Sequence, residues 1–162
     1  MKTLRLFGLT LMAILLSVNF TSCSNEDDPT KDPEKLTGEW ILTYEKEWGT
    51  EEGTNFNEET SYDFNTPEDG SEKMVIKEGT NKNEFELTYY YYSESSEEWE
   101  YDYKMTIKLD GNNVILSEED DEEYIVSSKY TYSLKDNKLT IKSYVKYTDD
   151  SEYNYEETYQ KK

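Results

Sequence analysis

The stretch Trp99–Leu109, WEYDYKMTIKL, decides the fold class of this 162-residue chain. Apolar and polar residues alternate along it without a break, which is the pattern of a β-strand with one face in water. The residues expected on its apolar face are Trp99, Tyr101, Tyr103, Met105, Ile107 and Leu109. The stretch therefore predicts an all-β protein.

The same alternation recurs from Gly38 to the end of the chain, without a convincing helical period. We expect eight strands, at about residues 38–48, 72–78, 84–92, 98–109, 113–118, 124–134, 138–147 and 152–160. Short turns rich in Gly, Asn and Asp separate several of them, and these residues tolerate positive φ. The pattern predicts an antiparallel up-and-down meander, which removes its exposed edges by closing into a barrel. A two-sheet β-sandwich is the alternative, and residues 60–64 are a candidate ninth strand.

Composition narrows the function classes. The chain has 37 acidic and 17 basic residues and no His, for a net charge of −20. Without His there is no His-based triad, His general base or His-ligated zinc, and no phosphate-binding glycine loop or other cofactor motif is present. Nucleic-acid binding needs a basic surface. We therefore expect a non-enzymatic protein that takes no cofactor and binds no nucleic acid.

The first residues predict export and a lipid anchor. Lys2 and Arg5 precede an apolar segment at 6–18, which is shorter than the ~20 residues of a membrane span but suits a signal peptide. The residues that follow, Phe20-Thr21-Ser22-Cys23, resemble a bacterial lipobox. This resemblance implies a lipoprotein signal peptide at 1–22 and lipidation of Cys23, the only Cys, so that acyl chains attach the protein to a membrane.

Removal of residues 1–22 would leave 15 basic and 37 acidic residues, for a net charge of −22. Residues 24–28 (SNEDD) resemble the acidic export signal of outer-membrane lipoproteins of Bacteroidetes, which implies the cell exterior. Residues 23–35 are expected to form a tether and 36–162 the β-domain. The acidic run 118–123 (EEDDEE) lacks the alternating ligands and glycine of a calcium loop, so we expect no metal site there.

Two short segments carry a family resemblance. The motif Leu36-Thr37-Gly38-Glu39-Trp40 resembles the amino-terminal Gly-x-Trp of lipocalins. The segment 134–141 (LKDNKLTI) resembles a hairpin of lipocalin-like lipoproteins of Bacteroidetes. The resemblance implies a calycin-type barrel, closed at one end, that holds a small ligand. In lipocalins a basic side chain near the carboxyl terminus packs over the motif Trp, and Lys161 and Lys162 are the candidates here.

The expected binding site lies at the end of the barrel opposite the short turns. Aliphatic residues gather near the turns 79–83, 110–113 and 135–138, whereas aromatic residues lie toward 93–98, 118–123 and 148–152, loops that hold acids and no lysine. If residues 49–71 form one loop, they join the acidic end. The candidate ligand-binding residues are Tyr89, Tyr91, Trp99, Tyr101, Tyr103, Tyr130, Tyr147 and Tyr153.

We therefore expect a cell-surface lipoprotein that binds a small ligand, amphiphilic or cationic, or a basic partner, at an aromatic and acidic mouth. The alternative is a non-catalytic interaction or structural module whose core is filled. The volume of the interior discriminates between the two, because a ligand site needs an empty cavity of ~300 Å³ or more.

Overall fold

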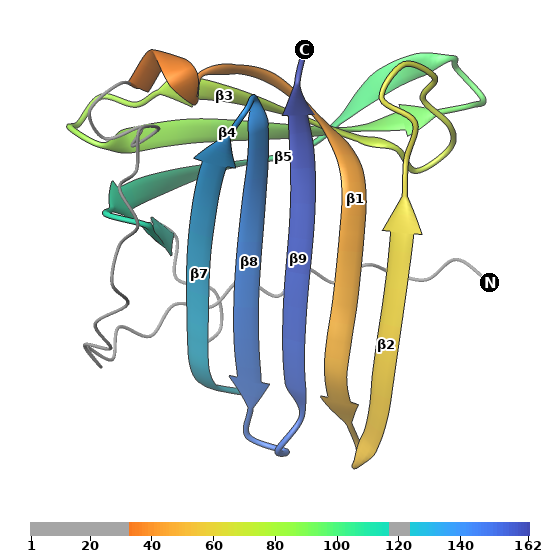
Figure 1. Ribbon diagram of the computed structural model, residues 1–162, viewed down its shortest axis with the longest axis vertical. Helices are drawn as coiled ribbons and strands as arrows, with labels where there is room; N and C mark the ends of the chain where they lie inside the picture. Colours follow the sequence, from red (N-terminus) through yellow and green to blue (C-terminus); the bar gives the residue numbers. More distant parts are fainter. Residues whose placement is uncertain (1–32, 117–123) are drawn as a thin grey trace.

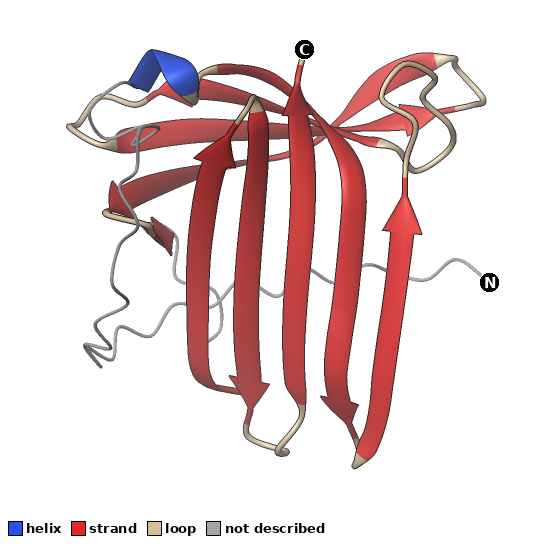
Figure 2. Ribbon diagram, in the orientation of Figure 1, coloured by secondary structure: helices blue, strands red, loops and turns tan. Residues whose placement is uncertain are grey.

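A computed structural model describes residues 33–116 and 124–162 of the chain, and Figures 1 and 2 show that almost all of this part is β-strand. The elements are the 3-10 turn η1 (Pro33–Lys35) and the strands β1 (Gly38–Glu51), β2 (Thr54–Ser61), β3 (Glu72–Glu78), β4 (Glu84–Ser93), β5 (Glu98–Asp110), β6 (Asn113–Leu116), β7 (Ile125–Lys135), β8 (Lys138–Tyr147) and β9 (Glu152–Lys161). The signal peptide, Cys23, most of the tether and the acidic run 118–123 lie outside the described residues.

Eight strands close into an antiparallel barrel in meander order. β3 to β9 pair in sequence, and β1 pairs with both β3 and β9, so the ladder runs full circle. The predicted lipocalin-like barrel is confirmed, and the sandwich alternative is not adopted. The β6–β7 junction is the thinnest part of the wall, since a single pair, Asn113 with Thr131, joins these strands. In Figure 1, β3, β4 and β5 cross behind β7, β8, β9, β1 and β2.

β2 is the ninth strand, and its position differs from the prediction. It spans 54–61 rather than 60–64, so residues 49–71 are not one loop. β2 pairs with the second part of β1, from Tyr44 to Glu51, whereas β3 pairs with the first part, from Gly38 to Ile41. β2 and β3 therefore lie end to end along β1 as one interrupted strand. For this reason the extra strand leaves the direction of the later strands unchanged.

The closed end is organised around Trp40, whose side chain is 0% exposed. Its indole Nε1 donates to the carbonyl of Leu36 at 2.7 Å, which seats the segment before β1 under the barrel. The ammonium of Lys161 lies 5.4 Å from the Trp40 ring centroid and also donates to the carbonyls of Glu34 and Lys35. Gly38 has φ +128°, and a Cβ there would lie 3.1 Å from Lys161 Cε. Lys161 thus occupies the place of the expected basic residue.

The three short turns gather at this closed end, as expected. The amide of Leu109 donates to Asn83 in the β3–β4 turn, and the amide of Tyr132 donates to Asn112 in the β5–β6 turn. The amide of Lys161 donates to Asn137 in the β7–β8 turn. These bonds join successive turns to neighbouring strands. The floor is therefore held by backbone hydrogen bonds as well as by packing.

The loops of the other end are only partly sorted as predicted. The β1–β2 and β8–β9 turns lie together, because Thr50 pairs with Glu152. The β4–β5 turn, residues 94–97, projects away from them at the upper right of Figure 1. The expectation that all acidic loops share one end is therefore wrong for this turn. The cause is the crossing of the two halves of the barrel, which sends the tip of the β4–β5 hairpin in a different direction.

A bulge in β1 exchanges the faces of its two halves. Leu42 pairs with Tyr159 and Tyr44 pairs with Thr158, so Thr43 is an extra residue. A bulge of one residue reverses which side chains point inward. Tyr44, which would share the face of Trp40 and Leu42 in a regular strand, therefore faces outward.

A second bulge lies in β5. Thr88 pairs with Lys104 and Tyr90 pairs with Tyr101, so β5 spans three residues where β4 spans two. The six apolar residues of 99–109 consequently do not share one face. Tyr103, Met105, Ile107 and Leu109 face inward, whereas Tyr101 and Trp99 face outward.

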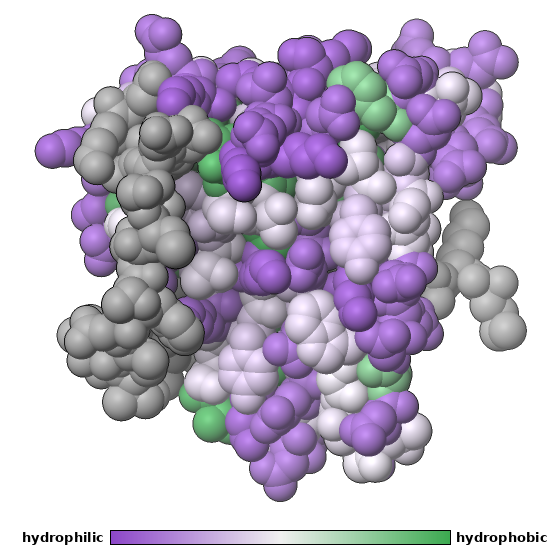
Figure 3. All heavy atoms as spheres, in the orientation of Figure 1, coloured by the Kyte–Doolittle hydropathy of each residue, from purple (hydrophilic) through white to green (hydrophobic). Residues whose placement is uncertain are grey.

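One outer side of the barrel wall is largely hydrophilic. Figure 3 shows the side formed by β7, β8, β9, β1 and β2, on which polar residues predominate and hydrophobic ones are scattered. Within residues 33–116 and 124–162, the structure holds no helix long and apolar enough to cross a membrane.

Candidate functional site

The barrel encloses a cavity of about 710 Å³ that opens opposite the floor. Aliphatic side chains from β3 to β6 and β8 line its lower part, and Leu36 lies there as well. The lining at this level is Leu36, Ile76, Leu87, Ile107, Leu109, Val114, Leu116, Leu139 and Ile141. The volume falls within the ~300–1,000 Å³ range of small-molecule sites. The core is therefore not filled by its own tyrosines.

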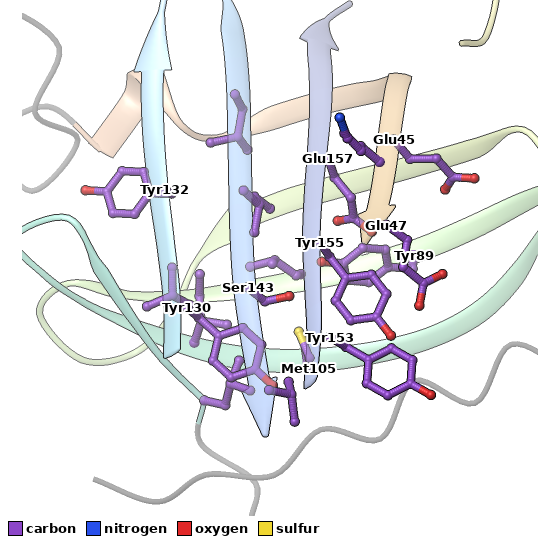
Figure 4. Close-up of a pocket in the computed structure, with 18 of the residues that line it drawn as sticks. Glu45, Glu47, Tyr89, Met105, Tyr130, Tyr132, Ser143, Tyr153, Tyr155 and Glu157 are labelled. Carbon is purple, nitrogen blue, oxygen red and sulfur yellow. The ribbon is translucent and has the colours of Figure 1, made fainter. Parts of the chain in front are cut away.

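The charged groups of the lining lie on one side only. The lining includes eight carboxylates and one ammonium, that of Lys46. They come from β1, β2, β9 and the β1–β2 and β8–β9 turns: Glu45, Glu47, Glu51, Glu52, Glu58, Glu59, Asp149 and Glu157. The lining residues of β3 to β8 are all uncharged. Figure 4 shows Glu45, Glu47 and Glu157 on one side of the cavity and Tyr130 and Tyr132 on the other.

Strand register stacks these carboxylates in levels. Glu45 pairs with Glu157 across β1 and β9, directly above the level of Leu42 and Tyr159. Two residues further along β1, Glu47 pairs with Tyr155 of β9 and with Glu58 of β2. At the next level Gly49 pairs with Tyr153.

Gly49 is required where it stands, because a Cβ there would lie 1.8 Å from the Glu152 carbonyl oxygen. Its missing side chain leaves room for two rings to meet over β1. Phe56 and Tyr153, which pair with Gly49 from β2 and β9, have their ring centroids 5.3 Å apart. The close β1–β9 approach thus brings an aromatic pair to the open end.

Five of the eight predicted ligand-binding residues line the cavity. These are Tyr89, Tyr103, Tyr130, Tyr147 and Tyr153. Tyr89 and Tyr103 stack with ring centroids 4.5 Å apart, from β4 and β5. Tyr147 and Tyr153 meet edge to face at 5.6 Å beside the β8–β9 turn. The structure therefore brings four of the five together in two pairs, one deep and one at the opening.

The other three predicted residues do not line the cavity. Tyr101 is 61% exposed and Trp99 is half-buried, and both lie on the outer face because of the β5 bulge. Trp99 and Tyr90 flank the Lys73 ammonium, which lies 5.1 and 4.7 Å from their ring centroids. Tyr91 is 40% exposed, and its hydroxyl donates to Glu100 at 2.6 Å. Tyr91 lies near the end of β4, beyond Tyr89, and is not part of the cavity lining.

The cavity tyrosines remain protonated well above neutral pH. Burial raises the pKa of Tyr130 to about 12. Burial, reinforced by nearby carboxylates, also raises the pKa values of Tyr103, Tyr153 and Tyr155. Since a neutral phenol both donates and accepts a hydrogen bond, these rings offer neutral polar groups beside the carboxylates.

A deeper polar group joins β9 to β3. The hydroxyl of Tyr159, fully buried, lies 2.5 Å from Glu72 Oε1 and 3.1 Å from Glu157 Oε2. Burial is the main cause that raises the pKa of Tyr159 well above its usual value. This contact links Glu157, which lines the cavity, to a buried side chain of the same strand.

Sequence reasoning missed the acidic residues inside the barrel and Tyr155. The inward orientation of Glu45 and Glu47 was not predicted, because the alternation of apolar and polar residues does not reveal the β1 bulge. Glu157 did leave a signal, since it lies between Tyr155 and Tyr159 at positions of the same parity. A carboxylate at an inward-facing position of a regular strand indicates a polar interior.

Chemically, the cavity offers carboxylate and phenol groups beside an apolar surface. In the part of the chain that the structure describes, no group of three or more acidic, His or Cys side chains is placed to hold a metal ion. The arrangement therefore favours binding by charge, ring contacts and burial of apolar surface.

The comparisons with known proteins extend only to solved structures. No protein-family model matches the chain, and no curated protein matches it. The siderocalin Ex-FABP, described as functioning through dual ligand specificities, superposes with a TM-score of 0.47 at 12% identity, over 79% of this chain and 74% of its own. The S-type phycobiliprotein lyase CPES from Guillardia theta gives 0.45 at 8% identity, over 85% and 94%. The strand order of this chain itself, rather than these distant matches, establishes its lipocalin-like barrel.

Proposed function

We propose that this protein binds a small amphiphilic cation inside its barrel and does not catalyse a reaction. The observation that carries the proposal is the cavity of about 710 Å³, with its aliphatic floor and its carboxylates on one side. Burial of apolar groups contributes roughly 25 cal/mol per Å². The carboxylates select the sign of the ligand's charge.

The proposed charge preference rests on the contrast within the lining. Eight acidic residues and one lysine border the cavity, so an anionic ligand would meet repulsion, whereas a cation would gain attraction. The tyrosine rings add a second source of attraction, because a cation over an aromatic face gains about 0.5–2 kcal/mol. Both effects act in the same direction.

Two probes of equal chain length and opposite charge test the proposal. Dodecylamine is expected to bind and to quench the intrinsic tyrosine and tryptophan fluorescence, whereas lauric acid is expected to bind at least about tenfold more weakly. Binding of neither probe, or tighter binding of lauric acid, would contradict the proposal. The first outcome would favour the alternative of an interaction module.

A pair of variants on β8 locates the binding. Ser143 lines the cavity, whereas Lys142 points outward and forms an ion pair with Glu156. Ser143→Trp fills the cavity and is expected to abolish dodecylamine binding. Lys142→Trp places the same side chain on the outer face and should leave binding intact. Equal binding by both variants would place the ligand elsewhere.

We also propose that the protein is a lipid-anchored outer-membrane lipoprotein that faces the cell exterior. The support is the lipobox-like sequence before Cys23 and the position of η1 at the closed end. A tether that leaves from the floor would turn the open end away from the membrane. Cys23→Ala should abolish labelling by radioactive palmitate and release the protein into soluble fractions. Continued membrane association of this variant would refute the anchor.

A further inference from the structure

The carboxylates of the cavity are spread along its depth. Glu45 and Glu157 lie one level above the floor, Glu47 and Glu58 form the next level, and Glu51 lies at the end of β1 near the opening. Residues two apart on a strand are separated by ~6.8 Å. The carboxylate side therefore carries charge at two successive levels and again at the rim, and the uncharged level of Gly49 and Tyr153 lies between them.

The part of the lining that comes from β4 and β5 is uncharged. β4 and β5 contribute Leu87, Tyr89, Tyr103, Met105 and Ile107 to the lining, and none of them is charged. The cavity thus has two unlike walls. A ligand that fills it meets carboxylates on the side of β1 and β9 and uncharged side chains on the side of β4 and β5.

Two simple ligand shapes match only part of this arrangement. An amphiphile with a single cationic head neutralises one level and leaves its tail beside the carboxylates of the others. A polyamine without apolar groups neutralises the carboxylates but leaves the wall of β4 and β5 in contact with water. Both mismatches cost binding free energy, because one places an apolar tail beside carboxylates and the other leaves apolar surface in contact with water.

We infer that the cavity takes an elongated oligocation, a short extended chain in which positive groups alternate with apolar groups. In an extended chain, side chains two residues apart share one face at ~6.8 Å, which is the spacing of Glu45 and Glu47 on β1. The positive groups would face β1 and β9, and the apolar groups would face β4 and β5. This inference rests on the proposed function, because it specifies the ligand of the same cavity.

Two blocked hexapeptides of identical composition test the alternation. One alternates lysine and valine, and the other has three lysines followed by three valines. Titration of the full chain in phosphatidylcholine vesicles, with protein-free vesicles as the blank, is expected to show about tenfold tighter binding of the alternating peptide. Equal affinity for the two peptides would overturn the inference.

Matched charge variants test the carboxylate wall. E45Q/E47Q/E157Q removes three cavity charges, and E94Q/E97Q/E98Q removes three charges around the β4–β5 turn, away from the cavity lining. The first is expected to weaken binding of the alternating peptide about tenfold or more, and the second by less than about twofold, since exposed charges beyond ~8–10 Å are screened. Circular dichroism verifies folding, and Glu47→Gln alone provides a milder variant. Equal effects of the two triple variants would overturn the inference.

Dodecylamine separates the two proposals. If it binds but the alternating peptide does not, the inference fails and the proposed function stands. If neither binds, both fail. Tight binding of the alternating peptide that also survives 0.5 M salt would contradict the role of the carboxylates.

Discussion

The two halves of β1 differ in what they place inside the barrel. From Gly38 to Leu42 the strand turns Trp40 and Leu42 inward, and both are almost completely buried. From Tyr44 onward, the inward residues are Glu45 and Glu47. The sequence alternates in the same manner through both halves, and the single extra residue between them separates a core strand from a binding-site strand.

The physical reason for the difference is access to water. The first half lies at the closed floor, where a carboxylate would lose its hydration without a partner, at high cost. The second half faces the open cavity, where inward carboxylates keep contact with water. Thr43, the extra residue, satisfies its own hydroxyl by donating to the carbonyl of Thr158 at 2.9 Å. The bulge therefore introduces no unsatisfied polar side chain.

The largest expected effect contrasts the two tryptophans of β1. Trp40→Ala should lower the free energy of unfolding by about 3–5 kcal/mol, because it removes a fully buried ring from the floor. Trp48→Ala should cost less than about 1 kcal/mol, because this ring lies on the outer face. Urea unfolding monitored by circular dichroism measures both. Similar losses would mean that the two halves of β1 are equally part of the core.

Gly49→Ala tests the close approach in the second half. The added methyl group would overlap the Glu152 carbonyl, a backbone atom, so β1 and β9 must separate locally. We expect a loss of about 1–3 kcal/mol in urea unfolding. Thr50→Ala, one position along the same strand, provides a control with an expected loss below about 0.5 kcal/mol. A neutral Gly49→Ala would show that the second half is loosely held.

Lys161→Met tests the contact that covers the first half. The substitution keeps an apolar stem but removes the cation over Trp40 and two hydrogen bonds to the segment before β1. We expect a loss of about 1–2 kcal/mol in the same assay. Lys162→Met, whose side chain reaches only Glu39 at 3.8 Å, should be nearly neutral. Equal effects would leave Lys161 without a special role.

The smallest expected effect concerns one phenol of the cavity. The pKa of Tyr130 is raised to about 12, so the folded state holds its proton more tightly than the unfolded chain, where the pKa is 10.0. Its contribution to stability is therefore complete below pH 10 and is lost as the pH rises toward 12. In a pH titration followed by absorbance at 295 nm, Tyr130→Phe should lack one phenolate that the unsubstituted protein forms near pH 12. If the missing phenolate is instead one that forms near pH 10, Tyr130 is exposed to water.

Several features of the fold and site could be predicted because they depend on local patterns. The alternation of 99–109 indicated a strand, and the Gly38-x-Trp40 motif predicted a buried tryptophan with a basic partner, found as Lys161. Five cavity tyrosines were also identified from their positions in strands. Tyr101 and Trp99 were wrongly predicted to face the cavity, because the alternation of apolar and polar residues does not reveal the β5 bulge.

The all-β class, the meander, its closure into a barrel and the aliphatic floor could be derived from the sequence, because alternation and turn residues act over a few neighbours. The faces that β1 and β9 turn inward, the open interior and the carboxylates of one wall follow only from the three-dimensional structure. These outcomes depend on the register between strands more than 100 residues apart, such as Glu45 with Glu157. A shift of one residue there reverses every side chain beyond it.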